Sequence, residues 1–83
     1  MKYVMLRLDS GELLPLLFPE FMQHAHMAQS VPATVVSAGR VYLEDGRLIA
    51  KGASSSLNVT SREEDSGIIQ AYFEEQNAIQ QKL

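Results

Sequence analysis

The pair Asp45-Gly46 constrains the fold more than any other feature, because it lies between two runs rich in strand-forming residues, 33–44 and 47–52. An Asp-Gly pair in this position is the strongest short signal for a two-residue hairpin turn, since both residues adopt positive φ angles readily. The sequence therefore predicts an antiparallel hairpin here. Glu44 and Arg47 flank the turn with opposite charges, and we expect them to pair across the two strands.

A second hairpin is predicted at the start of the chain. Residues 2–8 form a run of strand-forming residues, 9–12 have a turn composition, and 13–18 form a second apolar run. Pro15 interrupts that second run, and a proline within a strand confines the strand to a sheet edge. We therefore expect residues 13–18 to be a protected edge strand, while nothing in the sequence visibly protects the opposite edge.

Two glycines and a change of parity make the strands of the Asp45-Gly46 hairpin irregular. Gly39 lies inside the first strand and Gly52 inside the second, which indicates a bulge, a bend or another element passing close by. Leu48, Ala50 and Gly52 occupy even-numbered positions, whereas Leu57 and Val59 occupy odd-numbered positions. That shift predicts an extra residue near 54–56, and hence a bulge or kink between two strand pieces.

The first of two helices is predicted over residues 19–29. Pro19 suits the first turn of a helix, and the carboxylate of Glu20 is favoured there by the helix dipole. Phe21 and Ala25 fall on one apolar face at helical spacing, so both are expected to face the core.

The last helix is expected to run to about Gln81. A capping box starts it, either Ser61 with Glu64 or Thr60 with Glu63; alternatively, residues 62–65 form a turn and the helix begins at Ser66. Its apolar stripe comprises Ile68, Ile69, Tyr72, Phe73, Gln76, Ile79 and Leu83.

These elements predict a single compact α+β domain over residues 1–83. We expect a small antiparallel sheet of four or five strands with both helices packed on one face, in the order ββαββα. The expected core comprises Val4, Leu6, Leu14, Phe18, Phe21, Ala25, Val36, Val41, Leu48, Leu57, Ile69, Tyr72 and Phe73.

Composition excludes several classes of protein. The chain has no cysteine, which rules out disulfides and thiolate metal sites and favours a reducing, cytoplasmic location. The N-terminal segment lacks the apolar core of a signal peptide, and the longest apolar run is far short of the about 20 residues of a membrane span. The net charge of −3 disfavours a nucleic-acid surface. We expect no membrane association.

The two histidines, His24 and His26, raise the question of a metal or catalytic site. Residues two apart on a helix point nearly opposite ways, whereas histidines that share a metal stand three or four residues apart. His24 lies nearer the apolar face, so it is the candidate for a buried polar residue that donates a hydrogen bond to a carbonyl or carboxylate. No serine lies in a nucleophile elbow, and no glycine-rich loop has phosphate-binding spacing. We expect a protein that is not an enzyme, without catalytic residues, metal ligands or cofactors.

Three segments, FPEFMQHAHMAQ, VVSAGRV and GASSSLNVTSREEDSGII, resemble a family of short proteins encoded in bacteriophages and prophages. The similarity spans residues 18–69 and rests on His24, Ser37-Ala38-Gly39, Ser56-Leu57, Ser61-Arg62 and Asp65-Ser66. No activity is established for that family. The resemblance therefore implies a source and a size class rather than a mechanism.

The remaining expectation is a phage-type accessory protein that acts through protein–protein interaction, with an unknown protein or a second copy in a homodimer as its partner. A small domain with an unprotected edge strand often completes itself by association. The candidate surface residues are Arg40, Tyr42, Arg47 and Lys51 on the second hairpin and Tyr72 on the last helix. The alternative is a small nucleic-acid-associated protein that uses the Arg40–Lys51 hairpin, although neighbouring carboxylates would compete there with phosphates.

Overall fold

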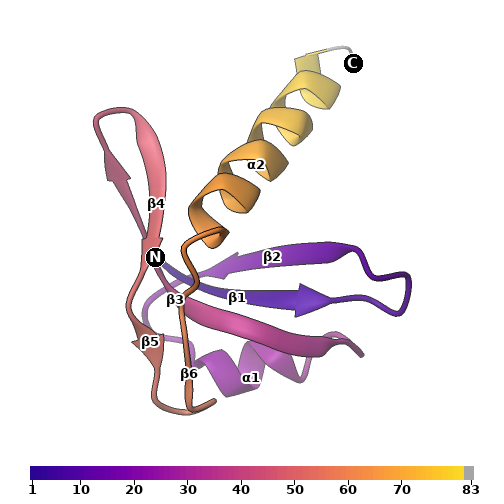
Figure 1. The fold of residues 1–83 in the computed structure, drawn as a ribbon, viewed down its shortest axis with the longest axis vertical. Helices are drawn as coiled ribbons and strands as arrows, with labels where there is room; N and C mark the ends of the chain where they lie inside the picture. Colours follow the sequence, from indigo (N-terminus) through magenta and orange to yellow (C-terminus); the bar gives the residue numbers. More distant parts are fainter. Residues whose placement is uncertain (82–83) are drawn as a thin grey trace.

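The computed structural model describes residues 1–81 and the side chains of residues 1–77. Its elements are, in order, β1 (Lys2–Arg7), β2 (Leu13–Phe18), α1 (His24–Ala28), β3 (Thr34–Glu44), β4 (Arg47–Lys51), β5 (Ala53–Ser54), β6 (Val59–Thr60) and α2 (Asp65–Gln81). Four strands form an antiparallel sheet in the order β2-β1-β3-β4, and β5 pairs with β6 in a separate ribbon (Figure 1). The predicted α+β class and four-stranded antiparallel sheet are confirmed, and β2 with its proline lies at an edge.

The two helices lie on opposite faces of the sheet, so the expectation that both pack on one face is wrong (Figure 1). Tyr3 and Met5 of β1 share an apolar cluster with α2, whereas Val4 and Leu6 share another cluster with α1. Successive strand residues point to opposite faces, so these clusters lie on the two sides of β1. Because β1 has apolar residues at both odd-numbered and even-numbered positions, helices can cover it on both faces.

Phe21 is the clearest error in the predicted core, since its side chain is 86% exposed. The physical reason is the short α1, which begins only at His24 and leaves Phe21 on the preceding turn. On α2, Ile69 is fully buried and Tyr72 is half-buried, while Phe73 is 38% exposed. Phe73 therefore lies at the border of the core rather than inside it.

The β3–β4 hairpin has the turn that Asp45-Gly46 predicts. The φ angles of Asp45 and Gly46 are 51° and 79°, as a type I′ turn requires. Glu44 lies opposite Arg47 in the register, but its carboxylate makes a different ion pair from the one expected. Glu44 Oε1 lies 2.9 Å from Lys51 Nζ, because the long lysine side chain runs along the same face of the hairpin.

Gly52 ends β4, whereas the sequence predicts it inside a longer strand. Its φ of +94° lies in the left-handed region, which glycine adopts readily, and turns the chain toward the β5–β6 ribbon. Leu57 and Val59 pack in the apolar cluster on the α1 face. The irregularity predicted near residues 54–56 is therefore a ribbon with its own turn over 55–58, rather than a bulge or a short kink between two strand pieces.

α2 begins at Asp65 after a turn over residues 63–64, close to the alternative start that the sequence allows. Neither predicted capping box occurs among the hydrogen bonds of the described residues. Instead, the backbone N–H of Arg62 donates to Asp65 Oδ2 at 3.0 Å. This bond is one half of a capping box, set one residue later than the pair Ser61 and Glu64. The predicted stripe positions 79 and 83 lie outside the described side chains.

Side chains of α2 cover the free edge of β4, which the sequence left without visible protection. The N–H of Ala50 donates to Ser66 Oγ at 2.8 Å, and the N–H of Leu48 donates to Gln70 Oε1 at 2.9 Å. The spacings match, because four helical residues rise about 6 Å and two strand residues about 6.6 Å. The expectation of an open edge is therefore wrong for this stretch of β4.

Gly39→Ala is expected to lower the free energy of unfolding by about 1–3 kcal/mol, because its Cβ would lie 2.6 Å from the backbone oxygen of Lys51. Gly67→Ala is the matched control, since no atom lies within 4 Å of the added Cβ. Alanine there should raise the free energy of unfolding by about 0.5–1 kcal/mol. Urea unfolding of both variants measures the difference. A Gly39→Ala protein of unchanged stability would contradict the close approach of β4 to β3.

Candidate functional site

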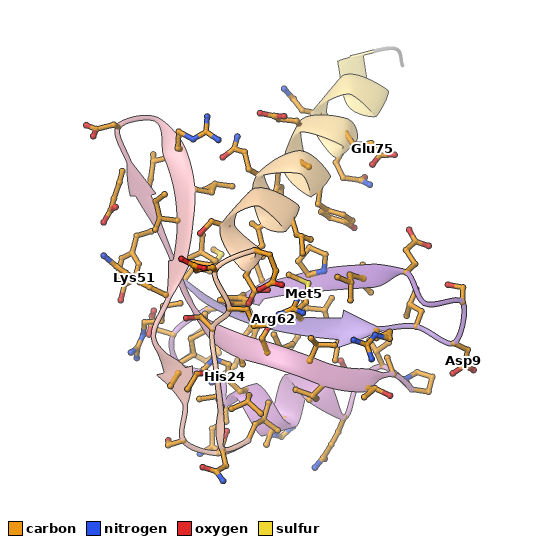
Figure 2. All side chains as sticks on the ribbon, in the orientation of Figure 1. Met5, Asp9, His24, Lys51, Arg62 and Glu75 are labelled. Carbon is orange, nitrogen blue, oxygen red and sulfur yellow. The ribbon has the colours of Figure 1, made fainter. Side chains whose placement is uncertain are left out.

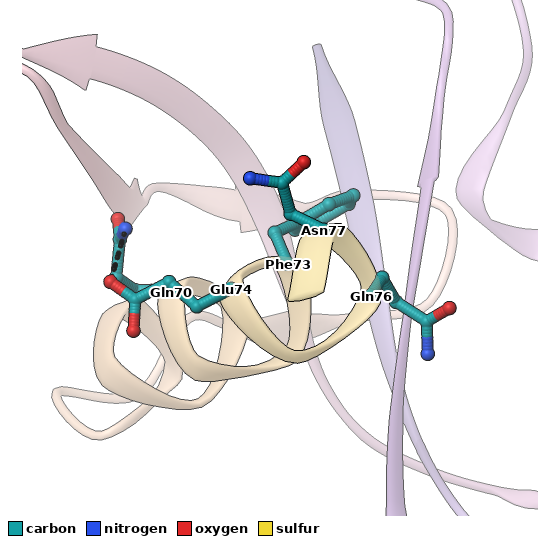
Figure 3. A pocket seen from close by; sticks show the side chains of 5 residues that line it. All are labelled: Gln70, Phe73, Glu74, Gln76 and Asn77. Carbon is teal, nitrogen blue, oxygen red and sulfur yellow. Dashed lines mark hydrogen bonds between the residues drawn. The ribbon is translucent and has the colours of Figure 1, made fainter. Parts of the chain in front are cut away.

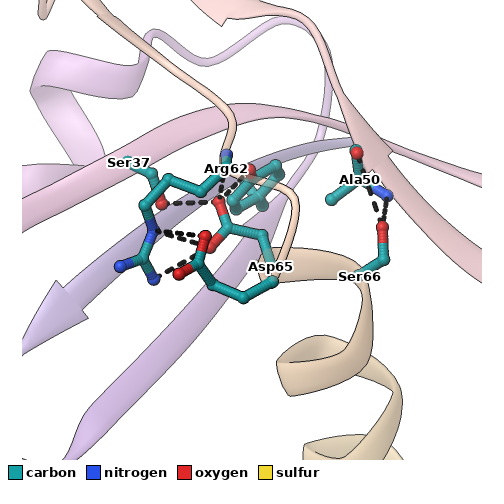
Figure 4. Close-up of polar contacts among 7 residues, drawn as sticks. Ser37, Ala50, Arg62, Asp65 and Ser66 are labelled. Carbon is teal, nitrogen blue, oxygen red and sulfur yellow. Dashed lines mark hydrogen bonds and ion pairs between the residues drawn. The ribbon is translucent and has the colours of Figure 1, made fainter.

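The carboxylate of Asp65 is fully buried at the start of α2 and collects hydrogen bonds from three parts of the chain (Figure 4). Tyr3 Oη and Ser37 Oγ each donate to Oδ2 at 2.6 Å. Arg62 donates its backbone N–H to the same oxygen, and its guanidinium Nη2 lies 2.9 Å from Oδ1. One carboxylate thereby joins β1, β3 and the segment before α2.

The environment of Asp65 keeps it ionised. Burial alone would raise the pKa of Asp65, but hydrogen bonds from Ser37, Tyr3 and Arg62 outweigh burial and hold that pKa below its ordinary value. Burial raises the pKa of Tyr3, and the hydrogen bond and negative charge of Asp65 raise it further. At neutral pH the cluster is therefore a carboxylate anion surrounded by neutral hydroxyl donors and one guanidinium.

This cluster is suited to holding α2 in place rather than to catalysis. Tyr3, Ser37 and Asp65 are fully buried, and both hydroxyl groups already donate to the carboxylate. Sequence reasoning assigned none of the three to a site. The signal that could have found Asp65 is its position three residues after Arg62, the spacing of a capping carboxylate.

His24 is buried where α1 meets the sheet (Figure 2), and His26 on the same helix is exposed. His24 Nε2 lies 2.9 Å from the carbonyl oxygen of Gly39, so this nitrogen carries the proton and donates. The ring also meets Phe18 edge-on, with 5.3 Å between centroids. Within residues 1–77, no three His, Asp or Glu side chains are grouped closely enough to hold a metal ion.

Four of the five predicted surface residues share one face of the β3–β4 hairpin. Alternation along β3 and the register with β4 place their side chains on the face that does not pack against α2. We call this face the hairpin surface; it comprises Arg40, Tyr42, Glu44, Arg47, Ile49 and Lys51. The fifth predicted residue, Tyr72, lies on α2 and is not part of it.

The charges of the hairpin surface are partly paired within the chain. Lys51 Nζ lies 2.9 Å from Glu44 Oε1 and 4.8 Å above the centroid of the Tyr42 ring. The hydrogen bond to Glu44, followed by the charge of that carboxylate, raises the pKa of Lys51. Arg47 makes no ion pair with any residue that the structure describes.

Phe21 lies on a turn next to the hairpin surface, and hydrogen bonds from two strands, β1 and β3, hold this turn in place. Arg40 Nε donates to the two carboxylate oxygens of Glu20 at 3.0 and 3.2 Å, and Lys2 Nζ donates to the Met22 carbonyl at 2.9 Å. The Arg40 hydrogen bond holds the pKa of Glu20 below its ordinary value, so this contact is ionic at neutral pH. We call residues 19–23 the Phe21 turn.

A hollow of about 570 Å³ lies along α2 (Figure 3). It is lined by Gln70, Phe73, Glu74, Gln76 and Asn77. Gln70 Nε2 donates to Glu74 Oε1 at 3.1 Å, and the Phe73 ring meets Tyr72 edge-on at 5.6 Å between centroids. We call the space lined by these five residues the α2 hollow. Its lining residues are on α2, which packs on the face of the sheet opposite to α1.

Comparison of the chain with models of protein families, with curated proteins and with solved structures gave no match. Over the described part of the chain, no helix combines the length and apolar character needed to cross a membrane.

Tyr3→Phe is expected to lower the free energy of unfolding by about 1.5–3 kcal/mol, because it removes a buried hydrogen bond to a charged group. Tyr42→Phe provides the matched control: this tyrosine is exposed on the hairpin surface, and its loss of a hydroxyl should change stability by less than about 0.5 kcal/mol. Chemical unfolding at pH 7 measures both. Equal effects of the two substitutions would contradict the role assigned to the cluster.

Proposed function

We propose that this chain is a non-enzymatic protein-binding module whose binding surface is the Phe21 turn with the adjoining hairpin surface. The observation that carries the proposal is the 86% exposure of Phe21 on a turn fixed from both sides. An exposed phenyl ring gains free energy when a partner removes it from water. A turn that is already fixed loses little conformational freedom on binding, so more of that gain is retained.

The composition of the neighbouring hairpin surface supports the same proposal. Aromatic residues and arginine are enriched at the energetic centres of protein interfaces. Here Phe21 and Tyr42 are exposed aromatic residues, and Arg40 and Arg47 lie on the same face of the hairpin as Tyr42. Pro15 lies on β2 at one edge of the sheet, and α2 side chains cover N–H groups of β4 at the other. We therefore infer association through side chains rather than by addition of a strand.

The proposal includes an accessory role for a bacteriophage or prophage in the cytoplasm of its host. Its support is the resemblance of residues 18–69 to the phage and prophage family, together with the absence of cysteine.

Nucleic-acid binding through the hairpin is the competing proposal, and the charge pairing weighs against it. Two of its three cations, Arg40 and Lys51, already contact the carboxylates of Glu20 and Glu44. A phosphate backbone would have to displace those carboxylates. Binding through many phosphates would also weaken about 10³-fold or more between 50 and 200 mM salt. Nucleic acid retained by the purified protein after a high-salt wash would favour this competing proposal.

Phe21→Ala is expected to weaken partner binding by about 30-fold, since truncating a central interface aromatic costs about 2 kcal/mol. The tagged chain is incubated with a lysate of cells that naturally express it, and the captured proteins are identified by mass spectrometry. A second copy of the chain counts as a captured partner in this experiment.

Leu43→Ala is the control, because Leu43 is a large exposed apolar residue outside the Phe21 turn and the hairpin surface. Both variants should keep the unfolding free energy of the original chain within about 0.5 kcal/mol. Equal capture by the Phe21→Ala chain, or loss of capture only with Leu43→Ala, would refute the proposed surface.

A further inference from the structure

Two exposed aromatic surfaces of this protein carry opposite local charge. Around Phe21, the hairpin surface and Glu20 contribute three cations and two carboxylates. Around Phe73, the neighbouring residues Glu74 and Glu75 are both acidic, and α2 contains no lysine or arginine. The first surface is thus net positive and the second net negative within one chain.

The two surfaces also differ in the size of the hollow beside each aromatic ring, and they lie on different sides of the molecule. The Phe21 turn includes Met22, which packs in the apolar cluster on the α1 face, whereas the α2 hollow is lined by residues of the helix on the other face. The Phe21 side chain is 86% exposed and lines a hollow of about 420 Å³ together with Met22, Gln23 and His26, whereas the α2 hollow is larger. Its volume of about 570 Å³ falls within the range of about 300–1,000 Å³ that is typical of binding pockets.

We propose that the Phe21 turn of one copy docks into the α2 hollow of a second copy, so that the chain assembles head to tail. This inference rests on the proposed function and names the partner of the Phe21 surface as the chain itself. Phe21 would pack against Phe73, and Arg47, which has no ion pair within the described chain, would face the acidic residues of α2.

Symmetry separates this arrangement from a twofold dimer. A twofold dimer brings the same patch of both subunits together. Pairing α2 with α2 would place Glu74 and Glu75 against their own copies, and like charges that face each other repel. A contact between two different patches leaves one Phe21 turn and one α2 hollow free at the ends. It therefore continues into a longer assembly or closes into a ring.

Both docking elements are fixed before they meet, which favours the association. Arg40 and Lys2 hold the Phe21 turn. The buried carboxylate of Asp65 and the bond from Leu48 to Gln70 hold α2 against the sheet. Neither side needs a conformational change to dock, so the entropy lost on assembly is mainly that of bringing two chains together.

Sedimentation velocity of the purified chain from micromolar to millimolar concentration tests the inference. We expect the original chain to form species larger than two copies. Phe21→Ala removes the exposed ring, and Asn77→Arg fills the α2 hollow with a bulky cation, so each variant alone should remain monomeric. An equimolar mixture of the two should form a complex of two chains and nothing larger, because one intact turn meets one intact hollow.

Circular dichroism establishes that each variant is folded, and Gln76→Arg provides a second way to block the α2 hollow. Leu43→Ala should assemble like the original chain, since Leu43 lies outside both surfaces. An original chain that stays monomeric, an assembly that stops at two copies, or a mixture of variants that stays monomeric would each overturn the inference. The lysate experiment remains separate: capture of a different protein that depends on Phe21 would keep the proposed function and still reject self-assembly.

Discussion

The buried carboxylate of Asp65 is the interaction on which the position of α2 depends. A buried ion without partners costs several kcal/mol, so this group is tolerated only with its donors in place. Those donors come from Tyr3 on β1, Ser37 on β3 and Arg62 before the helix. The cluster forms completely only when two strands and the helix start have met, which makes it a strong determinant of a single arrangement.

Fixing α2 at Asp65 also determines which surfaces of the protein remain available. The next residue, Ser66, reaches the N–H of Ala50, and Gln70 reaches that of Leu48 one helical turn later. The edge of β4 is thereby covered, and Pro15 occupies the edge strand on the other side. The surfaces proposed for association are the Phe21 turn with the hairpin surface on one face of the sheet and the α2 hollow on the other.

Local signals in the sequence predicted local structure well. Asp45-Gly46 predicted its hairpin, and Pro15 predicted an edge strand, because each acts through its own backbone conformation. The face of the sheet on which each helix packs could not be predicted, since β1 has apolar residues on both of its faces. The exposure of Phe21 was missed because Pro19 and Glu20 suit a helix start that the chain uses only from residue 24. The Asp65 cluster joins residues 62 positions apart, a separation at which local patterns carry no information.

The most direct test of the role of Asp65 is the pKa of its carboxyl group, followed by carbon-13 NMR of the folded protein across acidic pH. A folded-state pKa that is lowered relative to the unfolded chain stabilises the fold above the unfolded value, and this contribution is lost as the pH falls through the folded value. We expect the carboxyl group of Asp65 to titrate below its ordinary pKa of 3.8, and we expect Tyr3→Phe to raise that pKa. A pKa at or above 3.8 in the folded protein, or one unchanged by Tyr3→Phe, would contradict this expectation.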